Sequence, residues 1–166
     1  MPPSLDVYVI SGSRDRETIE RFIKMYVDRA ASEDRGDEEL SILPLGASEH
    51  PPDLHSWEWE PSKSLTHIVD RGLEYPRRAF CVYLKPMDWS LEWAILGFTT
   101  DDRVIFGISF DDEGGKVENF ERGKALLHEM ARVLGACEGF IGVEQGAPLT
   151  GTLFAQPIVV DPRAKD

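Results

Sequence analysis

Carboxylate side chains gather in two segments of this chain. Asp101 and Asp102 are adjacent, and Asp111, Asp112 and Glu113 follow after eight residues. The second group lacks the alternating ligands and the closing glutamate of an EF-hand loop, so the sequence does not indicate calcium binding. Closely spaced carboxylates favour recognition of the lysine and arginine side chains of a partner protein. The alternative interpretation is a solvated acidic turn.

Tryptophans give a second chemical signal. All four lie between residues 57 and 93. In the segment Trp57-Glu58-Trp59-Glu60, an extended chain would place both indole rings on one side and both carboxylates on the other. Because tryptophan is enriched at interface hot spots, we expect Trp57 or Trp59 to anchor a bound protein. The alternative is that these rings close the core beneath a long loop, since tryptophan is highly buried on average.

Gly12, Ser13 and Arg14 form a candidate phosphate-binding loop. They stand between a predicted strand and a predicted helix, where a glycine and a helix N-terminus together can hold an anion. The segment Ile10–Asp15 resembles the opening loop of Rossmann-like nucleotide-sensing proteins and, more loosely, of flavin mononucleotide reductases. The GxGxxG spacing is absent. The alternative is that Gly12 and Ser13 form only a turn and a helix cap.

Metal-binding and nucleophilic residues do not occur in recognisable sets. His128 and Glu129 would need a second histidine at position 132 for a zincin-like pair, and that residue is Arg132. The remaining histidines also lack a ligand set around them. No serine occupies a G-x-S-x-G turn, and neither cysteine has the basic neighbours that activate a thiol. We therefore predict no catalytic residue, no metal site and no cofactor.

Net charge restricts the partners of the chain. The 166 residues include 30 acidic and 18 basic ones, which gives a formal net charge of -12 at neutral pH. This charge repels nucleic-acid phosphates and anionic membrane surfaces, so we expect no nucleic acid and no membrane among the partners. It attracts basic proteins and speeds association with them. The alternative is that the charge only maintains solubility.

Cysteine content and the first residues bear on the cellular compartment. Cys81 and Cys137 are the only cysteines, which fits reduced thiols better than a disulfide framework. The first residues show no basic segment followed by an apolar core, and no apolar run is long enough to span a membrane. We therefore expect a cytoplasmic protein.

Hydrophobic periodicity predicts the strands and helices that must position these side chains. Alternating or β-branched runs predict strands at 5–10, 40–45, 79–84, 91–99, 103–110 and 140–144, with an edge addition at 158–160. Helical spacing of apolar residues predicts helices at 19–30 and 65–73 and a third over Phe120 to Leu134 with Phe120 on its inner face. The expected N-caps are Asp15 or Ser13, Ser62 or Ser64, and Asn119. Gly135 or Gly139 is expected to end the third helix.

The order of these elements predicts an α+β fold. A single mixed, largely antiparallel sheet carries about three helices packed against it, as a two-layer sandwich. Three consecutive strands with short connections indicate antiparallel pairing at the centre of the sheet. Residues 1–147 form one domain in this interpretation, and residues 148–166 form a proline-containing tail.

At the level of size and charge, the chain resembles the small acidic immunity proteins that neutralise bacterial polymorphic toxins. The hairpin from Trp93 to Phe110, followed by an acidic loop and a helix, adds to the resemblance. It implies a compact α/β domain that blocks the active site of a toxin. The sequence thus predicts a non-enzymatic protein that binds a basic partner protein. The alternatives are a nucleotide- or phosphate-binding domain and a homo-oligomer that pairs through an edge strand.

Overall fold

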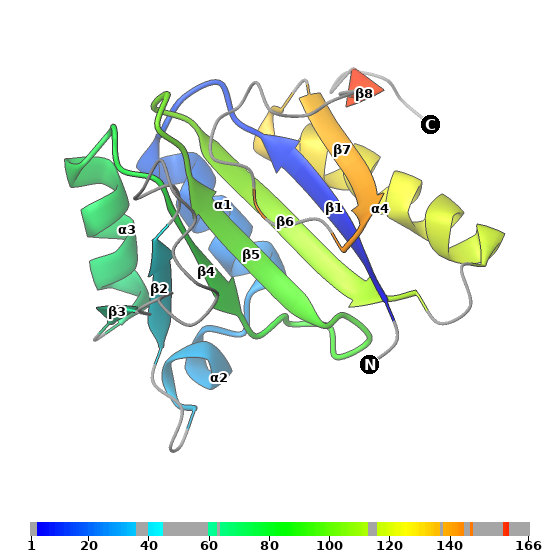
Figure 1. Cartoon of the computed structure of the whole chain (residues 1–166), viewed down its shortest axis with the longest axis horizontal. Helices are drawn as coiled ribbons and strands as arrows, with labels where there is room; N and C mark the ends of the chain where they lie inside the picture. Colours follow the sequence, from blue (N-terminus) through cyan, green and yellow to red (C-terminus); the bar gives the residue numbers. More distant parts are fainter. Residues whose placement is uncertain are drawn as a thin grey trace, which may run out of the picture.

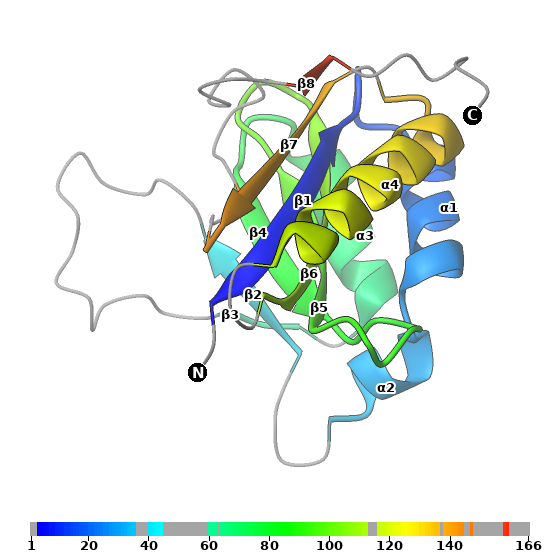
Figure 2. The ribbon, with the colours of Figure 1, turned by 90° about the vertical axis from the view of Figure 1, so that its right-hand side faces the viewer.

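One sheet organises the chain. The computed structural model describes residues 3–35, 40–44, 60–62, 64–112, 116–136, 138–144, 147 and 158–159. In this part of the chain eight strands form a single sheet. Figure 2 shows the sheet nearly edge-on, with helices gathered on one side of it. The predicted α+β two-layer fold is confirmed.

The strands pair in an order that mixes neighbours in sequence with distant segments. They are β1 (Ser4–Ile10), β2 (Ser41–Pro44), β3 (Glu60–Pro61), β4 (Phe80–Leu84), β5 (Trp93–Phe98), β6 (Val104–Asp111), β7 (Glu138–Val143) and β8 (Ile158–Val159). Their order across the sheet is β3-β2-β4-β5-β6-β1-β7-β8. Every pairing between these strands is antiparallel, so the described sheet is not mixed. The meander β4-β5-β6 has the short connections that the sequence predicted.

Alternation along the strands gives the sheet two different faces. In β1, Val7 and Val9 point into the main core beneath the helices. Tyr8 and Ile10 point to the opposite face, where they join a second apolar cluster. The period of two follows from the pleat of an extended strand. Consequently each strand contributes to both the helix-covered face and the opposite face.

The described part of the chain contains a short helix, α2, that was not expected. The helices are α1 (Arg16–Tyr26), α2 (Arg29–Glu33), α3 (Leu65–Glu74) and α4 (Val117–Leu134). The apolar spacing predicted a single helix through Ala30, but α1 ends at Tyr26. Val27 instead forms an isolated β-bridge with Pro86. Asp28 then caps the short helix α2, because its Oδ1 accepts a hydrogen bond from the amide of Ala31 at 3.0 Å. Pairing with the chain that follows β4 therefore ends α1 early.

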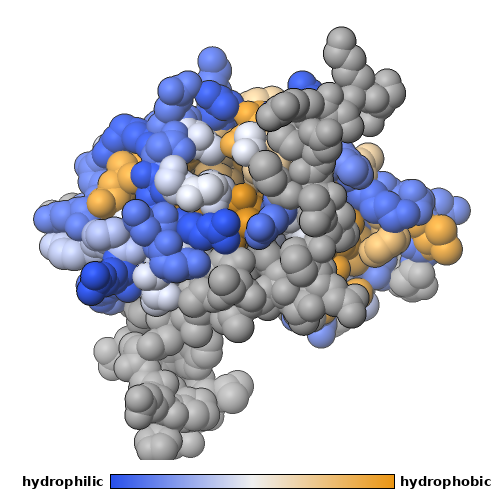
Figure 3. All heavy atoms as spheres, turned by 90° about the horizontal axis from the view of Figure 1, so that it is seen from above, coloured by the Kyte–Doolittle hydropathy of each residue, from blue (hydrophilic) through white to orange (hydrophobic). Residues whose placement is uncertain are grey.

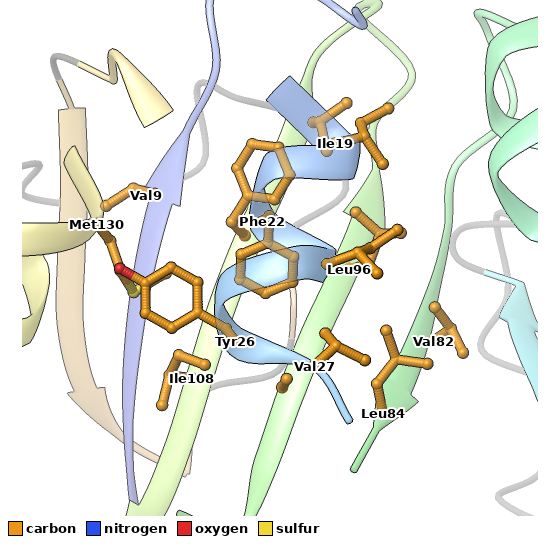
Figure 4. Close-up of a cluster of buried hydrophobic side chains, with 14 of the residues drawn as sticks. Val9, Ile19, Phe22, Tyr26, Val27, Val82, Leu84, Leu96, Ile108 and Met130 are labelled. Carbon is orange, nitrogen blue, oxygen red and sulfur yellow. The ribbon is translucent and has the colours of Figure 1, made fainter. Parts of the chain in front are cut away.

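Aromatic side chains hold α1 against the sheet. The ring centroid of Phe22 lies 4.9 Å from that of Phe106 and 5.5 Å from that of Tyr26. Figure 4 shows Phe22 and Tyr26 pointing from α1 among residues of the strands and of α4, including Leu96. The Tyr26 hydroxyl donates to Glu129 Oε1 at 3.0 Å, which links α1 to α4. Burial, followed by the charge of Glu129, raises the pKa of Tyr26 above its usual value.

The caps of the helices were predicted with mixed success. Asp15 caps α1 and Ser64 caps α3, as expected. The helix α4 ends at Gly135, whose φ of 66° is the left-handed conformation that glycine adopts readily. The prediction that Asn119 caps α4 was wrong, since the cap is Lys116. Phe120 was expected on the inner face and is 44% exposed, so that prediction was also wrong.

Gly72 of α3 permits the close packing of this helix on the sheet. A Cβ atom at this position would lie 2.1 Å from Cε1 of Phe98, whose ring is fully buried. Gly72→Ala is therefore expected to destabilise the protein by about 1–3 kcal/mol, because overpacking outweighs the gain in helix propensity. Urea unfolding measures the change. Gly12→Ala is the matched control, since a Cβ there meets nothing within 4 Å. Equal stability of the two variants would contradict the packing argument.

Candidate functional site

The two predicted groups of carboxylates lie at opposite ends of β6. Asp101 and Asp102 precede the strand, and Asp111 and Asp112 are at its end. At about 3.3 Å per residue, a strand of this length separates the groups by about 23 Å. Glu113 lies outside the described residues. The structure therefore does not bring these carboxylates together into one cluster.

Asp112 is buried and connects two segments of the fold. It is 6% exposed, and its Oδ1 accepts a hydrogen bond from Asn119 Nδ2 at 2.8 Å. Its amide donates to the carbonyl of Pro3 at 2.8 Å. Asp112 thus joins the first turn of α4 to the segment before β1.

Removing this carboxylate is expected to weaken the fold. Asp112→Ala removes a buried carboxylate and leaves the half-buried amide of Asn119 without its acceptor, which should lower the free energy of unfolding by about 1–3 kcal/mol. The neighbouring change Asp111→Ala, at an exposed position, is expected to have almost no effect. Chemical denaturation of the two variants compares them directly. A neutral Asp112→Ala would show that the hydrogen bond to Asn119 contributes nothing.

Arg14 is buried and bonded to backbone carbonyls. Its side chain is 2% exposed, and its guanidinium donates to the carbonyls of Gly72, Tyr75, Arg78 and Thr99. Burial lowers the pKa of Arg14, while the charges of Asp102 and Asp101 oppose this shift. Its Nε lies 3.8 Å from Oδ1 of Asp102. Arg14 therefore fastens the loop before α1 to the end of α3 and to the β5–β6 turn.

These contacts favour the turn-and-cap interpretation of the Gly12-Ser13-Arg14 loop. The Ser11 hydroxyl donates to the carbonyl of Ser13 at 2.7 Å and accepts from the amide of Val104 at 2.9 Å. The carboxylate of Asp15 already accepts at the N-terminus of α1. A phosphate at this loop would meet the negative charge of Asp15, and the Arg14 guanidinium is already bonded to backbone carbonyls.

Figure 3 views the molecule from above the orientation of Figure 1, and its described surface is largely hydrophilic.

The structure describes two of the four tryptophans, Trp89 and Trp93. Trp57 and Trp59, the predicted anchors, lie outside the described residues. Trp89 is 97% exposed, in the connection between β4 and β5. Trp93 begins β5, is partly buried, and belongs to the cluster on the sheet face opposite the helices.

Hydrogen bonds order the turn that carries Trp89. Asp88 Oδ1 accepts from the amide of Ser90 at 2.9 Å, and the carbonyl of Asp88 accepts from the amide of Leu91 at 3.0 Å. Hydrogen bonds from Ser90 lower the pKa of Asp88. The amide of Met87 donates to the carbonyl of Tyr26 at 2.9 Å, which ties the turn to the end of α1. The indole of Trp89 is therefore presented to solvent by a structured turn.

An open cavity of about 730 Å³ lies beside Trp89. It is lined by Asp28, Ala31, Asp34, Arg35, Lys85, Pro86, Met87, Trp89, Leu91 and Glu92. A second cavity, of about 470 Å³, shares Asp28 and Met87 with it and continues along α1. Met87 is 54% exposed. We call the lining of the first cavity the Trp89 surface.

A smaller cavity lies on the sheet face opposite the helices. It has a volume of about 230 Å³ and is lined by Ser4, Asp6, Tyr8, Tyr83, Glu92, Trp93, Ile95, Ser109 and Glu144. Three of these residues are acidic and none is basic. We call it the acidic cavity. It shares Glu92 with the Trp89 surface.

Burial and charge keep the phenols of the acidic cavity protonated. Burial, followed by the charge of Asp6, raises the pKa of Tyr8 far above its usual value. Burial also raises the pKa of Tyr83 to about 12, with smaller effects of Cys81 and Asp6. Both tyrosines are neutral near pH 7. The carboxylates of Asp6, Glu92 and Glu144 therefore determine the charge of this cavity.

The predicted anchors Trp57 and Trp59 lie outside the described residues, so the prediction of an anchoring tryptophan there stays a prediction. Among the described residues, the exposed tryptophan is Trp89, which sequence reasoning did not single out. The missed signal was the setting of Trp89 among Pro86, Asp88 and Ser90, which are turn-forming residues. A tryptophan within such a turn has few neighbours to bury it.

Comparisons with known proteins add little. No protein-family model matches the chain, and no curated protein matches its sequence. A T6SS protein from Pseudomonas aeruginosa has a similar solved structure, with a TM-score of 0.37 and 11% identity over 86% of this chain. The match covers 42% of that protein's chain. A similarity of this size supports no conclusion about activity.

Among the residues that the structure describes, no group of three or more histidine, cysteine, aspartate or glutamate side chains is placed to hold a metal ion. No helix within the described ranges is long and apolar enough to cross a membrane.

Proposed function

We propose that this protein binds one basic partner protein through the Trp89 surface and that it acts by binding rather than by catalysis. The observation that carries the proposal is the 97% exposure of Trp89 on an ordered turn beside Asp28, Asp34 and Glu92. An indole presented to solvent contributes little to the fold. The same indole contributes strongly to the binding free energy when a partner protein buries it.

Energetics support a tryptophan anchor with a charged rim, in which Asp28, Asp34 and Glu92 lie beside Arg35 and Lys85. Hot spots of protein interfaces are enriched in tryptophan and are surrounded by residues that exclude water. Burial of an aromatic side chain removes about 150–250 Å² of surface from water, and the nearby Met87 extends the apolar area. Carboxylates at the rim act mainly on the rate of encounter and on the choice of partner. The net charge of -12 acts in the same direction.

The partner that we expect is a toxin, by the resemblance of the sequence to small acidic immunity proteins. A binding protein of this type neutralises its target by covering a basic active-site surface. The size of the chain, its acidity and the exposed Trp89 support this proposal. Arginine and lysine on the toxin would meet the carboxylates that flank Trp89.

Site-specific photo-crosslinking tests the proposal. A photoreactive amino acid is placed at position 89 of the full chain in the source cell, and a control chain carries it at Tyr75, which is 47% exposed beyond the end of α3. We expect one dominant adduct with a basic protein from position 89 and none from position 75. When the crosslinking is repeated in an extract of that cell, the yield of the adduct should fall as salt rises, because exposed charges are screened. Equal adducts from both positions, or no adduct at low salt, would overturn the proposal.

A further inference from the structure

We propose that Met87 is a redox switch of the Trp89 surface, in which oxidation of its thioether to a sulfoxide by a peroxide releases the partner protein. The inference rests on the proposed function, because it concerns the regulation of that same surface. Met87 stands two positions before the proposed anchor Trp89. A methionine side chain is flexible and apolar when reduced, and it becomes polar when oxidised.

Met87 lies where the two cavities beside Trp89 meet. It lines the cavity of about 730 Å³ and the cavity of about 470 Å³, and Asp28 is the other residue that lines both. Met87 is 54% exposed, although methionine is a side chain that proteins usually bury. Its amide donates to the carbonyl of Tyr26 at 2.9 Å, so its backbone is held against the end of α1. A partner that covers Trp89 and enters these cavities therefore contacts the Met87 side chain.

Apolar neighbours make the reduced form of Met87 the favourable one in a complex. Pro86 and Leu91 line the larger cavity with it, and Ile23 and Val27 line the smaller one. A thioether packs well against such side chains and against the aromatic rings of a partner. A sulfoxide oxygen covered by the same apolar groups would lose its hydrogen bonds to water, which costs free energy. The oxidised residue therefore favours the free protein, in which solvent reaches it.

The oxidation step needs only a peroxide and an exposed sulfur. A lone pair of Met87 Sδ attacks one oxygen of hydrogen peroxide, an S–O bond forms, and the O–O bond breaks. The sulfur loses two electrons to the peroxide, and the leaving hydroxide takes up the proton of the attacked oxygen. The products are the sulfoxide and one water molecule. Methionine sulfoxide reductases restore the thioether, so the change is reversible.

Exposure selects Met87 among the sulfur-containing side chains that the structure describes. Met130 of α4 is fully buried, and Cys81 is also buried. Burial raises the pKa of Cys81 to about 12, so its thiol stays protonated near pH 7 and reacts slowly. Met25 of α1 is 43% exposed but lines neither of the two cavities. Peroxide therefore reaches Met25 as well, which makes it the matched control for Met87.

Peroxide treatment of the purified full chain tests the switch through crosslinking at position 89. The chain carries the photoreactive amino acid in place of Trp89, so oxidation of that indole does not contribute. After treatment the peroxide is removed with catalase, and the chain is mixed with a dilution series of the source-cell extract. We expect the extract concentration that gives half-maximal adduct to rise about tenfold or more, since a buried polar group is left unsatisfied. Methionine sulfoxide reductase should restore the original value.

Two variants locate the effect, each compared with its own untreated sample. In Met87→Leu, peroxide should leave the half-maximal concentration unchanged, because leucine is apolar and contains no sulfur. Met25→Leu should lose affinity on treatment as the parent chain does. Peptide mass spectrometry verifies which methionines carry the sulfoxide, and circular dichroism verifies that the treated chains stay folded.

The outcomes separate this inference from the proposed function. A half-maximal concentration that oxidation of Met87 leaves unchanged, or that rises equally in Met87→Leu, would overturn the switch while crosslinking at position 89 stands. A Met87 that stays reduced under peroxide conditions that oxidise Met25 would overturn the switch as well. No adduct from the untreated chain would instead remove the proposed function, and the switch with it.

Discussion

Arg14→Ala is expected to lower the free energy of unfolding by about 3–5 kcal/mol, the largest effect of any change described here on stability. The substitution removes a buried cation and leaves the carbonyls of Gly72, Tyr75, Arg78 and Thr99 without their donor. It also removes the contact of the guanidinium with the ring of Phe98, 5.3 Å from its centroid. Gly72 and Thr99 are buried residues, so the loss of a donor to their carbonyls accounts for most of the effect.

Urea unfolding measures this effect, with two variants for comparison. Arg16→Ala is the matched control, because Arg16 forms its ion pair with Asp70 at the surface, where the two side chains are 49% and 54% exposed. Exposed pairs of this kind contribute about 0–1 kcal/mol. Arg14→Lys should recover only part of the stability, since lysine cannot reach several carbonyls with a planar fork. If Arg14→Ala were no worse than Arg16→Ala, the fastening role of Arg14 would be wrong.

Trp89→Ala is expected to weaken binding to the partner by about 30-fold or more without loss of stability. The stability should change by less than about 0.5 kcal/mol, because the side chain is almost entirely in solvent. Loss of affinity should appear mainly as faster dissociation, since anchors act on the lifetime of a complex. Surface plasmon resonance with the partner identified by crosslinking separates the two rate constants.

Tyr75→Ala provides the control for Trp89→Ala. Tyr75 is an exposed aromatic residue next to the carbonyls that Arg14 binds, and Arg14 also binds Thr99, just beyond the end of β5. Trp89 precedes the start of β5, so the two positions lie at opposite ends of the sheet. Unchanged binding of Tyr75→Ala would show that the loss is local to the Trp89 surface. An equal loss in both variants would point to a general effect of removing surface aromatics.

Stability and binding are therefore expected to separate along the strands. One end of the sheet is fastened by Arg14, which bonds the loop before α1 to α3 and to the β5–β6 turn. The other end carries Trp89, the acidic cavity and an ordered turn. Arg14→Ala should change unfolding without changing the residues of the Trp89 surface, and Trp89→Ala should change binding without changing unfolding.

Local patterns in the sequence were sufficient for most elements. The spacing of Ile19, Phe22, Ile23 and Tyr26 predicted α1 because it repeats with the period of a helix, and all four residues are buried. Alternation predicted the meander β4-β5-β6. Asp15, Ser64 and Gly135 were each one of two residues expected at a helix end, because the chemistry of caps is local.

Contacts between distant residues could not be read in this way. Asn119 has the right residue type for a cap, but its side chain donates to Asp112, seven residues earlier, after the chain has turned. Arg14 was considered for phosphate binding, and its carbonyl partners come from segments 58 to 85 residues away. The end of α1 at Tyr26 likewise depends on Pro86.

The sequence by itself determined the fold class, the acidity and the expectation of tryptophan beside carboxylates, because composition and periodicity are properties of short segments. Only the tertiary structure decided which residues meet. Strand pairing set Ser109 between Trp93 and Asp6. Burial decided that Arg14 stabilises the fold and that Trp89 faces solvent, since exposure depends on neighbours that the sequence order does not reveal.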